Sequence, residues 1–578
     1  MNRRVRTTAS AGSIRIIKRW LLPAVDSSAA AALSAALGVA RPIAEILCAR
    51  GYSDPSGAQA FLNPQIAQMH DPHLLRDLTP ALDRIRRAIQ NSEKILICGD
   101  YDVDGTTSTV ILKTAIQMAG GTADFHIPHR LKEGYGLHES VIEQAAADGV
   151  TLVISVDTGI RAGEVVARAS QLGVDVIVTD HHLPEEALPP AFAVINPNRL
   201  DCAYPDKGLC GVGVAFKLVQ ALLAVQGWPE EKLQRVLESF LKLVAIGTVA
   251  DVVPLTGENR IIVKHGLAGL RNVRSPGLKA LLAVAGFDAT RIPSAGEIAF
   301  RIAPRINAAG RMDSAAEVVE LFTTTDAPRA RELAEKLHGF NADRQSEESQ
   351  IVDECAAIAV DPAHFALVYS SADWHRGVLG IVASRMVERH HRPVIVLSEE
   401  NGVARGSGRS IPQFHLLDAL ESMADLFDRF GGHRHAAGLT LATAKIPLFR
   451  ERLNAYAAAR LTAEDFRPAL RVDACVDLRE LNGDVFDQLQ QLAPFGAGNP
   501  NPVFVARGLE VAHPVTYMKE KHIKVTLRQG DRTQIFKGFH FADRVPELPM
   551  CARIDAAFQL EPDSYNGGFS AILKDIQA

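Results

Sequence analysis

The chain has 578 residues, more than one hydrophobic core usually supports, so we expect about three or four domains. Its formal net charge of −5 argues against a uniformly basic nucleic-acid coat but is compatible with a local basic groove. Seven cysteines are dispersed without a Cys-x-x-Cys pair, which predicts reduced thiols in the cytoplasm, with neither a disulfide framework nor a zinc site. Because no apolar run reaches the ~18 residues of a membrane helix, no membrane association is expected.

The N-terminal residues 1–40 open with a cluster of arginines and lysines. The apolar stretch that follows is short and is interrupted by Pro23, which excludes a secretory signal and predicts a flexible basic segment. From residue 28 to 92 the apolar residues recur with helical period, which predicts a small helical cap on the first domain.

The stretch 94–109 carries the first chemical signal. Its apolar residues 95–98 predict a buried strand that ends at Gly99, and Asp100, Asp102 and Asp104 follow at alternate positions. On an extended backbone these carboxylates share one side and repel one another unless cations lie between them. Such oxygen clusters suit Mg²⁺ or Mn²⁺, although a single Asp-x-Asp is also typical of a solvated turn.

Two further apolar segments end in the same way. Residues 151–156 lead to Asp157, and residues 174–179 lead to the triplet 180–182, Asp-His-His. Helical periods separate the three strands, at 108–118, 140–147 and 162–172, which predicts a parallel sheet whose site lies beyond the carboxyl ends of its strands. A fourth segment, 241–255, is an apolar helix or strand interrupted by Asp251, and a metal would offset the cost of burying that acid.

These four segments, in this order, resemble motifs I to IV of the DHH phosphoesterase superfamily, and within it they are most similar to the RecJ family of single-strand-specific exonucleases. The stretches 404–410 and 430–438 resemble the accompanying DHHA1 domain, the second through its Gly-Gly-His-x-x-Ala-Ala-Gly pattern. The similarity covers nearly the whole chain after about residue 40.

The resemblance implies two divalent ions, Mn²⁺ or Mg²⁺. By motif matching, Asp157 is the bridging carboxylate, and the ligands of one ion are Asp104, His181 and Asp251. Asp102 belongs to the other ion. Asp100 and His182 are expected as catalytic neighbours, either as additional ligands or just behind the ligands.

Basic and glycine-rich stretches are candidates for phosphate binding. Arg130 follows a predicted strand in a Pro- and Gly-containing loop, and Arg311 lies in an Asn-Ala-x-Gly-Arg stretch similar to one that approaches the active site in the family. We expect residues 407–410 to form a loop rich in hydrogen-bond donors. In residues 431–433 we expect the backbone amides and an imidazole to contact a phosphate. The phosphate-binding candidates are Arg130, Arg311, Ser407, Arg409, Gly432 and His433.

The predicted fold class is α/β: a DHH-type parallel-sheet domain and an α/β DHHA1 domain joined by a long polar helix over 327–357, then an OB-like β-barrel. We expect a flexible segment at 1–40, the catalytic domain with its cap at 41–270, a connecting helical segment at 271–360, DHHA1 at 361–462 and the barrel at 467–578. Candidate DNA contacts on the barrel are named only as a group: Phe495, Tyr517, Lys519, Lys521, His522, Lys524, Phe536, Lys537 and Tyr565.

The resemblance implies a 5′-to-3′ single-strand exonuclease that releases 5′-mononucleotides in DNA repair and recombination. A narrow passage between the first two lobes excludes duplex in the family, whose expected partners are single-stranded DNA, a single-strand-binding protein and a RecQ-type helicase. We expect a cytoplasmic monomer.

Three other interpretations stay open. Residues 102–106 also fit the Asp-x-Asp-x-Thr signature of haloacid-dehalogenase phosphatases, but that chemistry needs no histidines. DHH relatives that hydrolyse pyrophosphate, nano-RNA or cyclic dinucleotides are shorter chains. The third interpretation is a non-catalytic scaffold that binds single-stranded DNA. The ligating residues present in all four motifs argue against it.

Overall fold

The computed structural model describes residues 18–130, 132–288, 291–563 and 567–577. The chain divides into two units. One comprises residues 28–346 and 484–501, and the other comprises 347–483 and 502–578 together with the described residues before Ser28.

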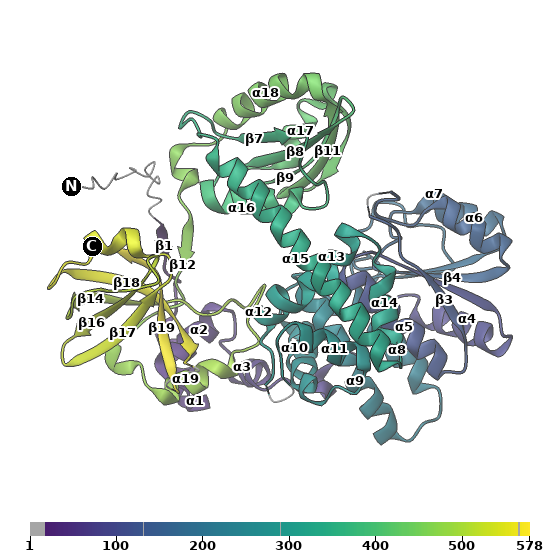
Figure 1. The fold of residues 1–578 in the computed structure, drawn as a ribbon. Helices are drawn as coiled ribbons and strands as arrows, with labels where there is room; N and C mark the ends of the chain where they lie inside the picture. Colours follow the sequence, from purple (N-terminus) through teal and green to yellow (C-terminus); the bar gives the residue numbers. More distant parts are fainter. Residues whose placement is uncertain (1–17, 131, 289–290, 564–566, 578) are drawn as a thin grey trace. The chain divides into compact units, whose positions relative to one another are not determined.

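The described part of the first unit contains a sheet of five parallel strands in the order β3-β2-β4-β5-β6. Two of them, β3 and β4, are labelled in Figure 1. The strands are β2 (Lys94–Gly99), β3 (Ala123–His126), β4 (Val150–Val156), β5 (Asp175–Thr179) and β6 (Ala193–Ile195). The crossover helices are α5 (Val103–Met118), α6 (Glu139–Ala147) and α7 (Gly163–Gln171). The predicted parallel sheet is confirmed.

Both faces of this sheet are covered, which explains why its strands are continuously apolar. On β4, Leu152 and Ile154 point into the core that contains α5, α4 (Leu78–Gln90) and α8 (Gly211–Ala224). Val153, between them, points to the opposite face and packs with α6 and α7. The period of two therefore distributes one strand between two cores.

A helical layer extends the first core well beyond the predicted boundary at residue 270. It comprises α9 (Glu230–Ala250), α10 (Gly257–Gly269), α11 (Pro276–Val284), α12 (Ala295–Glu297), a π-turn η4 (Ile298–Ile302), α13 (Ala303–Met312), α14 (Ala316–Thr323) and the start of α15 (Ala327–Ala357). Side chains as far as Leu337 are buried in the same core as β2. We therefore correct the expected connecting segment 271–360, most of which is part of the catalytic unit. The predicted long helix over 327–357 is α15.

The small helices before the sheet are α1 (Ser27–Leu37), α2 (Arg41–Ala49) and α3 (Pro55–Leu62). A distant segment, α19 (Gly483–Gln491) and the residues after it, joins this unit through buried Arg260. The Arg260 guanidinium donates to the carbonyls of Phe61 at 2.7 Å, Leu492 at 2.9 Å and Ala493 at 2.9 Å. Residues 484–501, which were expected in the barrel domain, pack with the first unit.

In the second unit, the described residues form a mixed sheet in the order β10-β11-β9-β8-β7. Its strands are β7 (Leu367–Ser371), β8 (Val394–Glu400), β9 (Val403–Arg409), β10 (Phe427–Gly432) and β11 (Ala436–Ala442). The helices are α16 (Leu379–His390), α17 (Leu416–Glu421) and α18 (Ile446–Ala458). This is the predicted second α/β domain.

The C-terminal strands close into a barrel, as predicted. The described strands follow the order β13-β14-β18-β19-β17-β16-β15, and β14 also pairs with β16, so that five of them form a ring. The strands are β13 (Ala474–Cys475), β14 (Phe504–Val511), β15 (Thr516–Met518), β16 (His522–Gln529), β17 (Arg532–Gly538), β18 (Arg553–Pro562) and β19 (Phe569–Gln577).

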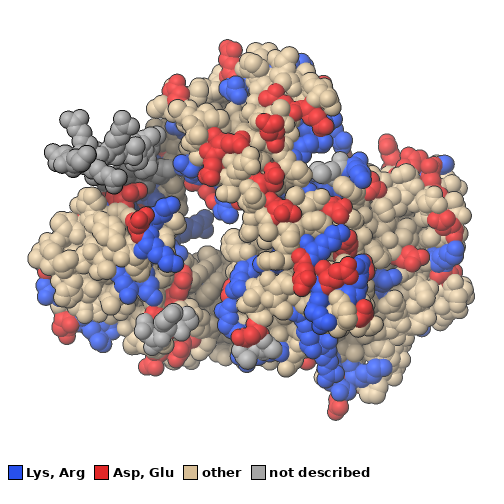
Figure 2. All heavy atoms as spheres, viewed as in Figure 1, with Lys and Arg blue, Asp and Glu red and all other residues tan. Residues whose placement is uncertain are grey.

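The N-terminal prediction is partly wrong. Strand β1 (Arg19–Leu21) pairs with β12 (Ala469–Arg471), and Trp20 Nε1 donates to Asp575 of the barrel at 2.7 Å. Residues 19–21 and 27–37 are thus ordered as strand and helix, whereas the rest of the predicted basic tail, 1–17, lies outside the described residues. Basic and acidic side chains are interspersed over the visible surface, in keeping with the modest net charge (Figure 2).

Within the described ranges, no single helix combines the length and apolarity of a membrane span. The pair α1 and α2, which is bent by 119°, meets that test only when the two helices are taken together.

Candidate active site

Three acids lie at the carboxyl ends of adjacent strands. Asp100 follows β2, Asp157 follows β4 and Asp180 follows β5, so the parallel sheet brings them to one edge. The condition under which the carboxylates of Asp100, Asp102 and Asp104 would share one side, an extended backbone, is not met, because α5 begins at Val103. Asp102 caps this helix through its Oδ1, which accepts from the Gly105 amide at 3.0 Å.

The third carboxylate of that stretch is held by a second helix. Asp104 lies in the first turn of α5, and its two oxygens accept the amides of Gly211 at 2.6 Å and Val212 at 2.7 Å. These amides open α8, and the positive end of that helix stabilises the carboxylate. The position of Asp104 therefore depends on residues more than a hundred positions away.

The ring of His181 is the meeting point of three carboxylates. Its Nε2 lies 3.2 Å from Asp157 Oδ1, 3.7 Å from Asp251 Oδ2 and 3.9 Å from Asp104 Oδ2. Asp251 is the residue that ends α9, which resolves the predicted helix-or-strand alternative for residues 241–255. Val252 after it has φ 61, a conformation that a β-branched residue rarely adopts.

Asp157 is shared between two groups of ligating atoms. It combines with Asp100 and Asp102 on one side and with His181 and His182 on the other, and within each group the atoms lie within 4.8 Å of one another. A carboxylate that bridges two cations needs such a position. Asp157 itself has φ 60, in the left-handed region, where Asp is tolerated better than most residues.

Asp180 holds the two histidines in place. Its Oδ1 accepts the His181 amide at 2.7 Å and His182 Nδ1 at 2.7 Å, and its Oδ2 accepts the Ile160 amide at 3.0 Å. Burial would raise the pKa of Asp180, but the hydrogen bond and charge of His182 outweigh it, so the pKa is lowered. In turn, although burial lowers the pKa of His182, Asp180 raises it above the ordinary value. Because Nδ1 is engaged, His182 Nε2 is left for a cation or a substrate.

The remaining acids repel one another in a poorly solvated place. Burial first, and then the neighbouring carboxylates, raise the pKa of Asp104 to about 7, of Asp100 to about 8 and of Asp251 to about 9. The pKa of Asp157 is also raised well above its usual value, for the same two reasons. Burial lowers the pKa of His181 to about 4, so its ring is neutral and able to ligate a cation.

Unsatisfied polar atoms test whether these residues fit a metal. Asp100 Oδ1, Asp157 Oδ1, Asp251 Oδ2 and His181 Nε2 are all buried without a hydrogen-bond partner. Leaving several such atoms unpaired is costly, and bound cations would give them partners. The set of carboxylate oxygens and imidazole nitrogen fits Mn²⁺ and Mg²⁺.

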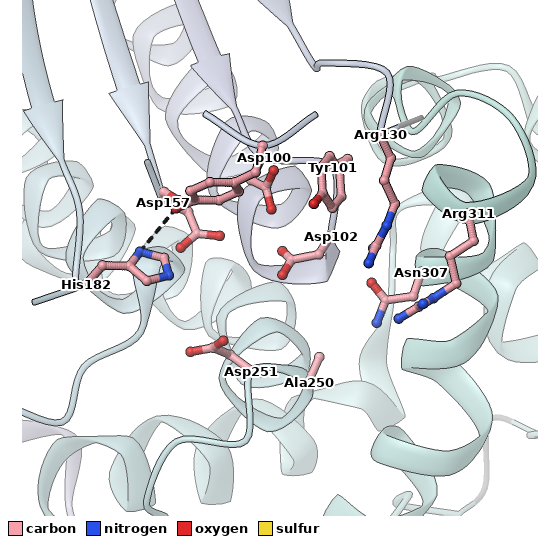
Figure 3. Close-up of a pocket in the computed structure, with 11 residues that line it drawn as sticks. Asp100, Tyr101, Asp102, Arg130, Asp157, His182, Ala250, Asp251, Asn307 and Arg311 are labelled. Atoms are coloured by element: carbon pink, nitrogen blue, oxygen red, sulfur yellow. Dashed lines mark hydrogen bonds between the residues drawn. The ribbon is translucent and has the colours of Figure 1, made fainter. Parts of the chain in front are cut away.

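A cavity of about 370 Å³ opens over this cluster (Figure 3). The side chains of Arg130 and Arg311 lie on the side away from His182, so acids and bases line opposite parts of the same cavity. The lining residues are Asp100, Tyr101, Asp102, Arg130, Tyr135, Asp157, His182, Ala250, Asp251, Asn307 and Arg311.

Four lining residues are not among the site residues predicted from the sequence: Tyr101, Tyr135, Ala250 and Asn307. The Tyr101 ring lies under the Arg130 guanidinium at 4.7 Å and orients it. Asn307 Oδ1 accepts the Val103 amide at 3.2 Å, which fastens the acidic turn to α13. Tyr135 donates its hydroxyl to the carbonyl of Asp157 at 3.2 Å. The one sequence signal for Tyr135 is its position between Gly134 and Gly136.

The other predicted phosphate contacts belong to the second unit. Ser407 and Arg409 lie in strand β9 and not in a loop, which corrects the prediction. The glycines beside them serve packing, because a Cβ at Gly406 would lie 2.3 Å from the Val396 carbonyl oxygen. Arg409 donates to Ser407 Oγ at 2.9 Å, and both side chains abut Gly380 in the first turn of α16.

Gly432 and His433 lie at the hairpin between β10 and β11. The His433 amide already donates to the Ala436 carbonyl at 2.8 Å, so this amide is engaged by the hairpin and not available as predicted. Of the grouped barrel candidates, Phe536 is buried in the barrel core and Tyr517 is exposed. Phe495 belongs to the first unit, and Tyr565 lies outside the described residues.

Carboxylates and imidazoles at the carboxyl edge of a parallel sheet, with arginines facing them, define a metal-dependent phosphoesterase of the DHH class. Three family models match the chain: the N-terminal domain of the DHH family at residues 94–248, the DHHA1 domain at 363–459 and the RecJ OB domain at 472–574.

Curated and solved relatives agree with these models. The single-stranded-DNA-specific exonuclease RecJ of Bacillus subtilis is 38% identical over 556 residues, which cover 95% of this chain and 69% of that protein. RecJ of Thermus thermophilus, crystallised with Mn²⁺, superposes with a TM-score of 0.83 at 31% identity, covering 97% of this chain and 79% of that one. Its Mg²⁺ complex superposes with a TM-score of 0.77. The chain belongs to the RecJ family of single-stranded-DNA-specific exonucleases.

Proposed function

We propose that the protein degrades single-stranded DNA from its 5′ end with Mn²⁺ or Mg²⁺ as cofactor, releasing 5′-mononucleotides in DNA repair and recombination. The observation that carries the proposal is a cavity lined both by three acids with an unsatisfied carboxylate oxygen, Asp100, Asp157 and Asp251, and by two arginines. Such a site suits a phosphodiester, whose charge the arginines bind while the acids hold cations.

Asp157 would be a ligand of both cations. Asp104, His181 and Asp251 would hold one of them, and Asp102 would hold the other, with Asp100 as a close neighbour. When bound, such ions polarise phosphoryl oxygens and lower the pKa of a bound water. The protein fixes the ligands beforehand, because Asp180 orients both histidines and the first turn of α8 holds Asp104. His182 presents Nε2 to the same cavity.

Arg130 and Arg311 bind the phosphate next to the one that is cleaved. Guanidinium groups remain charged at any working pH and bind phosphate in a bidentate manner. Ser407 and Arg409 of the second unit, together with Gly432 and His433, bind the terminal 5′-phosphate. This anchor sets the direction of cleavage.

The first test is the digestion of a 3′-labelled, 5′-phosphorylated single strand with Mn²⁺, beside its duplex form and a 5′-blocked form. We expect progressive shortening of the single strand alone. If all three substrates stay intact while short oligomers, cyclic dinucleotides or pyrophosphate are hydrolysed, the small-substrate relatives are the better model. Binding of the strand without any hydrolysis would favour the scaffold.

The site assignments are tested by two variants. Asp157→Ala should abolish turnover and leave the thermal unfolding profile intact, so unchanged turnover would remove Asp157 from the centre. Arg409→Ala should slow digestion of a 5′-phosphorylated strand by about 10- to 100-fold, the value of one charged hydrogen bond, and affect a 5′-hydroxyl strand less. Arg452→Ala is the matched control, since Arg452 makes a surface ion pair with Asp425 in the same unit. Equal losses on both substrates would exclude the anchor.

The partners that we propose are a single-strand-binding protein and a RecQ-type helicase, with the chain acting as a monomer in the cytoplasm. Reduced cysteines and the barrel module support this arrangement. Light scattering of the purified chain checks the monomer. Stimulated digestion of duplex DNA on addition of each purified partner checks the others.

A further inference from the structure

A thiol lies beside the cluster of acids. Cys210 is the residue before α8, and its side chain is fully enclosed. Its Sγ, one oxygen of Asp104 and one oxygen of Asp251 lie within 4.8 Å of one another. The thiol donates to Thr248 Oγ1 at 3.4 Å, while the Thr248 hydroxyl donates to the Val244 carbonyl.

Two buried carboxylate oxygens without hydrogen-bond partners are independent evidence for a cation site beside Cys210. Asp157, only 3% exposed, has an Oδ1 without a hydrogen-bond partner. This oxygen faces the start of α8, since a Cβ built on Gly211 would lie 2.7 Å from it. Asp251, which belongs to the same group as the thiol, also has an unpartnered oxygen, Oδ2.

The donors at this end of the centre therefore differ in kind. Carboxylate oxygens suit Mn²⁺ and Mg²⁺, which gain little from sulfur, whereas Zn²⁺ and Cd²⁺ bind thiolate well. We propose that Cys210 becomes a ligand when a thiophilic cation enters the site, so that Cd²⁺ and Zn²⁺ are held more tightly than Mn²⁺ and block the reaction. Only the expected block of the reaction rests on the proposed function.

The binding step is an exchange of a proton for a cation. The S–H bond of Cys210 breaks, its proton leaves to solvent, and a sulfur–metal bond forms while the cation keeps its charge. The hydrogen bond to Thr248 is given up in exchange. No oxidation is involved.

The test uses the full-length, metal-free protein and Cd²⁺ alone, followed by Mn²⁺ competition. Thiolate ligation produces an ultraviolet sulfur-to-cadmium charge-transfer band. We expect this band in the unaltered protein and its loss in Cys210→Ser, which keeps a hydroxyl donor for Thr248. The ratio of the Cd²⁺ to the Mn²⁺ affinity should fall at least about tenfold.

Cys202→Ser is the matched control. Cys202 is also buried in the same unit, where its Sγ accepts the Arg76 amide, and this variant should keep both the band and the affinity ratio. An undiminished band or an unchanged ratio in Cys210→Ser would overturn the inference. If that variant does not fold, cadmium NMR of the unaltered protein decides, because the shift of the bound ion in a site with one sulfur differs from that in an all-oxygen and nitrogen site.

The cadmium assay contains no DNA, so it tests Cys210 as a ligand independently of the proposed exonuclease function. An active exonuclease without a Cys210-dependent band would refute the thiol ligand alone. A Cys210-dependent band in a protein that digests no single strand would refute the proposed function and leave the mixed-donor site in place.

Discussion

Replacing Gly211 by alanine tests how tightly the two sides of the active site are packed. A Cβ at this position would lie 2.6 Å from Asp157 Cβ, 2.7 Å from its Oδ1 and 2.8 Å from its Cγ. Carbon atoms in contact prefer about 3.5 to 4.0 Å, so one side must move by roughly 1 Å. Neither can do so freely. The Asp157 amide donates to the Thr179 carbonyl at 3.0 Å, and the Gly211 amide donates to Asp104 at 2.6 Å.

Whichever side yields, one of two carboxylates that we propose as metal ligands, Asp157 or Asp104, is displaced. A displacement of that size costs about a hundredfold in rate, and overpacking costs about 1 to 3 kcal/mol of stability. The assay is single-strand digestion with Mn²⁺, together with Mn²⁺ affinity by calorimetry and thermal unfolding. Gly339→Ala in α15 is the control, since nothing lies within 4 Å of its Cβ position and a helical glycine gains up to about 1 kcal/mol as alanine. A folded Gly211→Ala variant with unaltered rate and Mn²⁺ affinity would refute this account of the packing.

Three further results are expected. Without metal, the pKa of Asp104 is raised to about 7 and that of Asp100 to about 8. Because both values lie above the unfolded pKa of about 4, these carboxyl groups stabilise the fold fully below pH 4. That stabilisation is lost as the pH rises through 7 to 8. Since Mn²⁺ must displace their protons, the rise in melting temperature on adding Mn²⁺ should be larger near pH 9 than near pH 6, and equal rises would contradict this. Asp180→Asn should weaken Mn²⁺ binding by about 10- to 100-fold in calorimetry, because His181 and His182 lose the carboxylate that accepts from both. An unaltered Mn²⁺ affinity would show that this carboxylate is not needed to orient them. Lys217→Met should lower the free energy of unfolding by about 3 to 5 kcal/mol in scanning calorimetry, because it removes the cation that lies 2.5 Å from buried Glu258 and leaves that carboxylate with neutral donors, the His70 amide and the Tyr204 hydroxyl. Lys217→Met combined with Glu258→Gln should recover most of the loss, and no recovery would assign the cost to packing.

Local sequence patterns were enough to predict the layout of the sheet and most of the acids and histidines that meet at its edge. Apolar strands ending in Asp100, Asp157 and Asp180, separated by segments of helical period, are local patterns, and a parallel sheet then places their ends at one edge. The polar composition of 327–357 likewise marked α15 with its full length. The family resemblance then supplied the ligand roles, which periodicity alone does not distinguish.

The surroundings of those side chains, in contrast, could not be predicted before the fold was known. The amides of Gly211 and Val212 on Asp104, the enclosed Cys210 and the packing of residues 484–501 on Arg260 all join positions far apart in the chain. Strand β9 is a second example of a feature that local patterns did not predict. Its glycines are typical of a loop, but Gly406 lies in a strand, where the backbone of Val396 leaves no room for a side chain. Hydrophobic period and turn chemistry report short-range preferences, whereas these contacts depend on which distant surfaces the fold brings within a few ångströms.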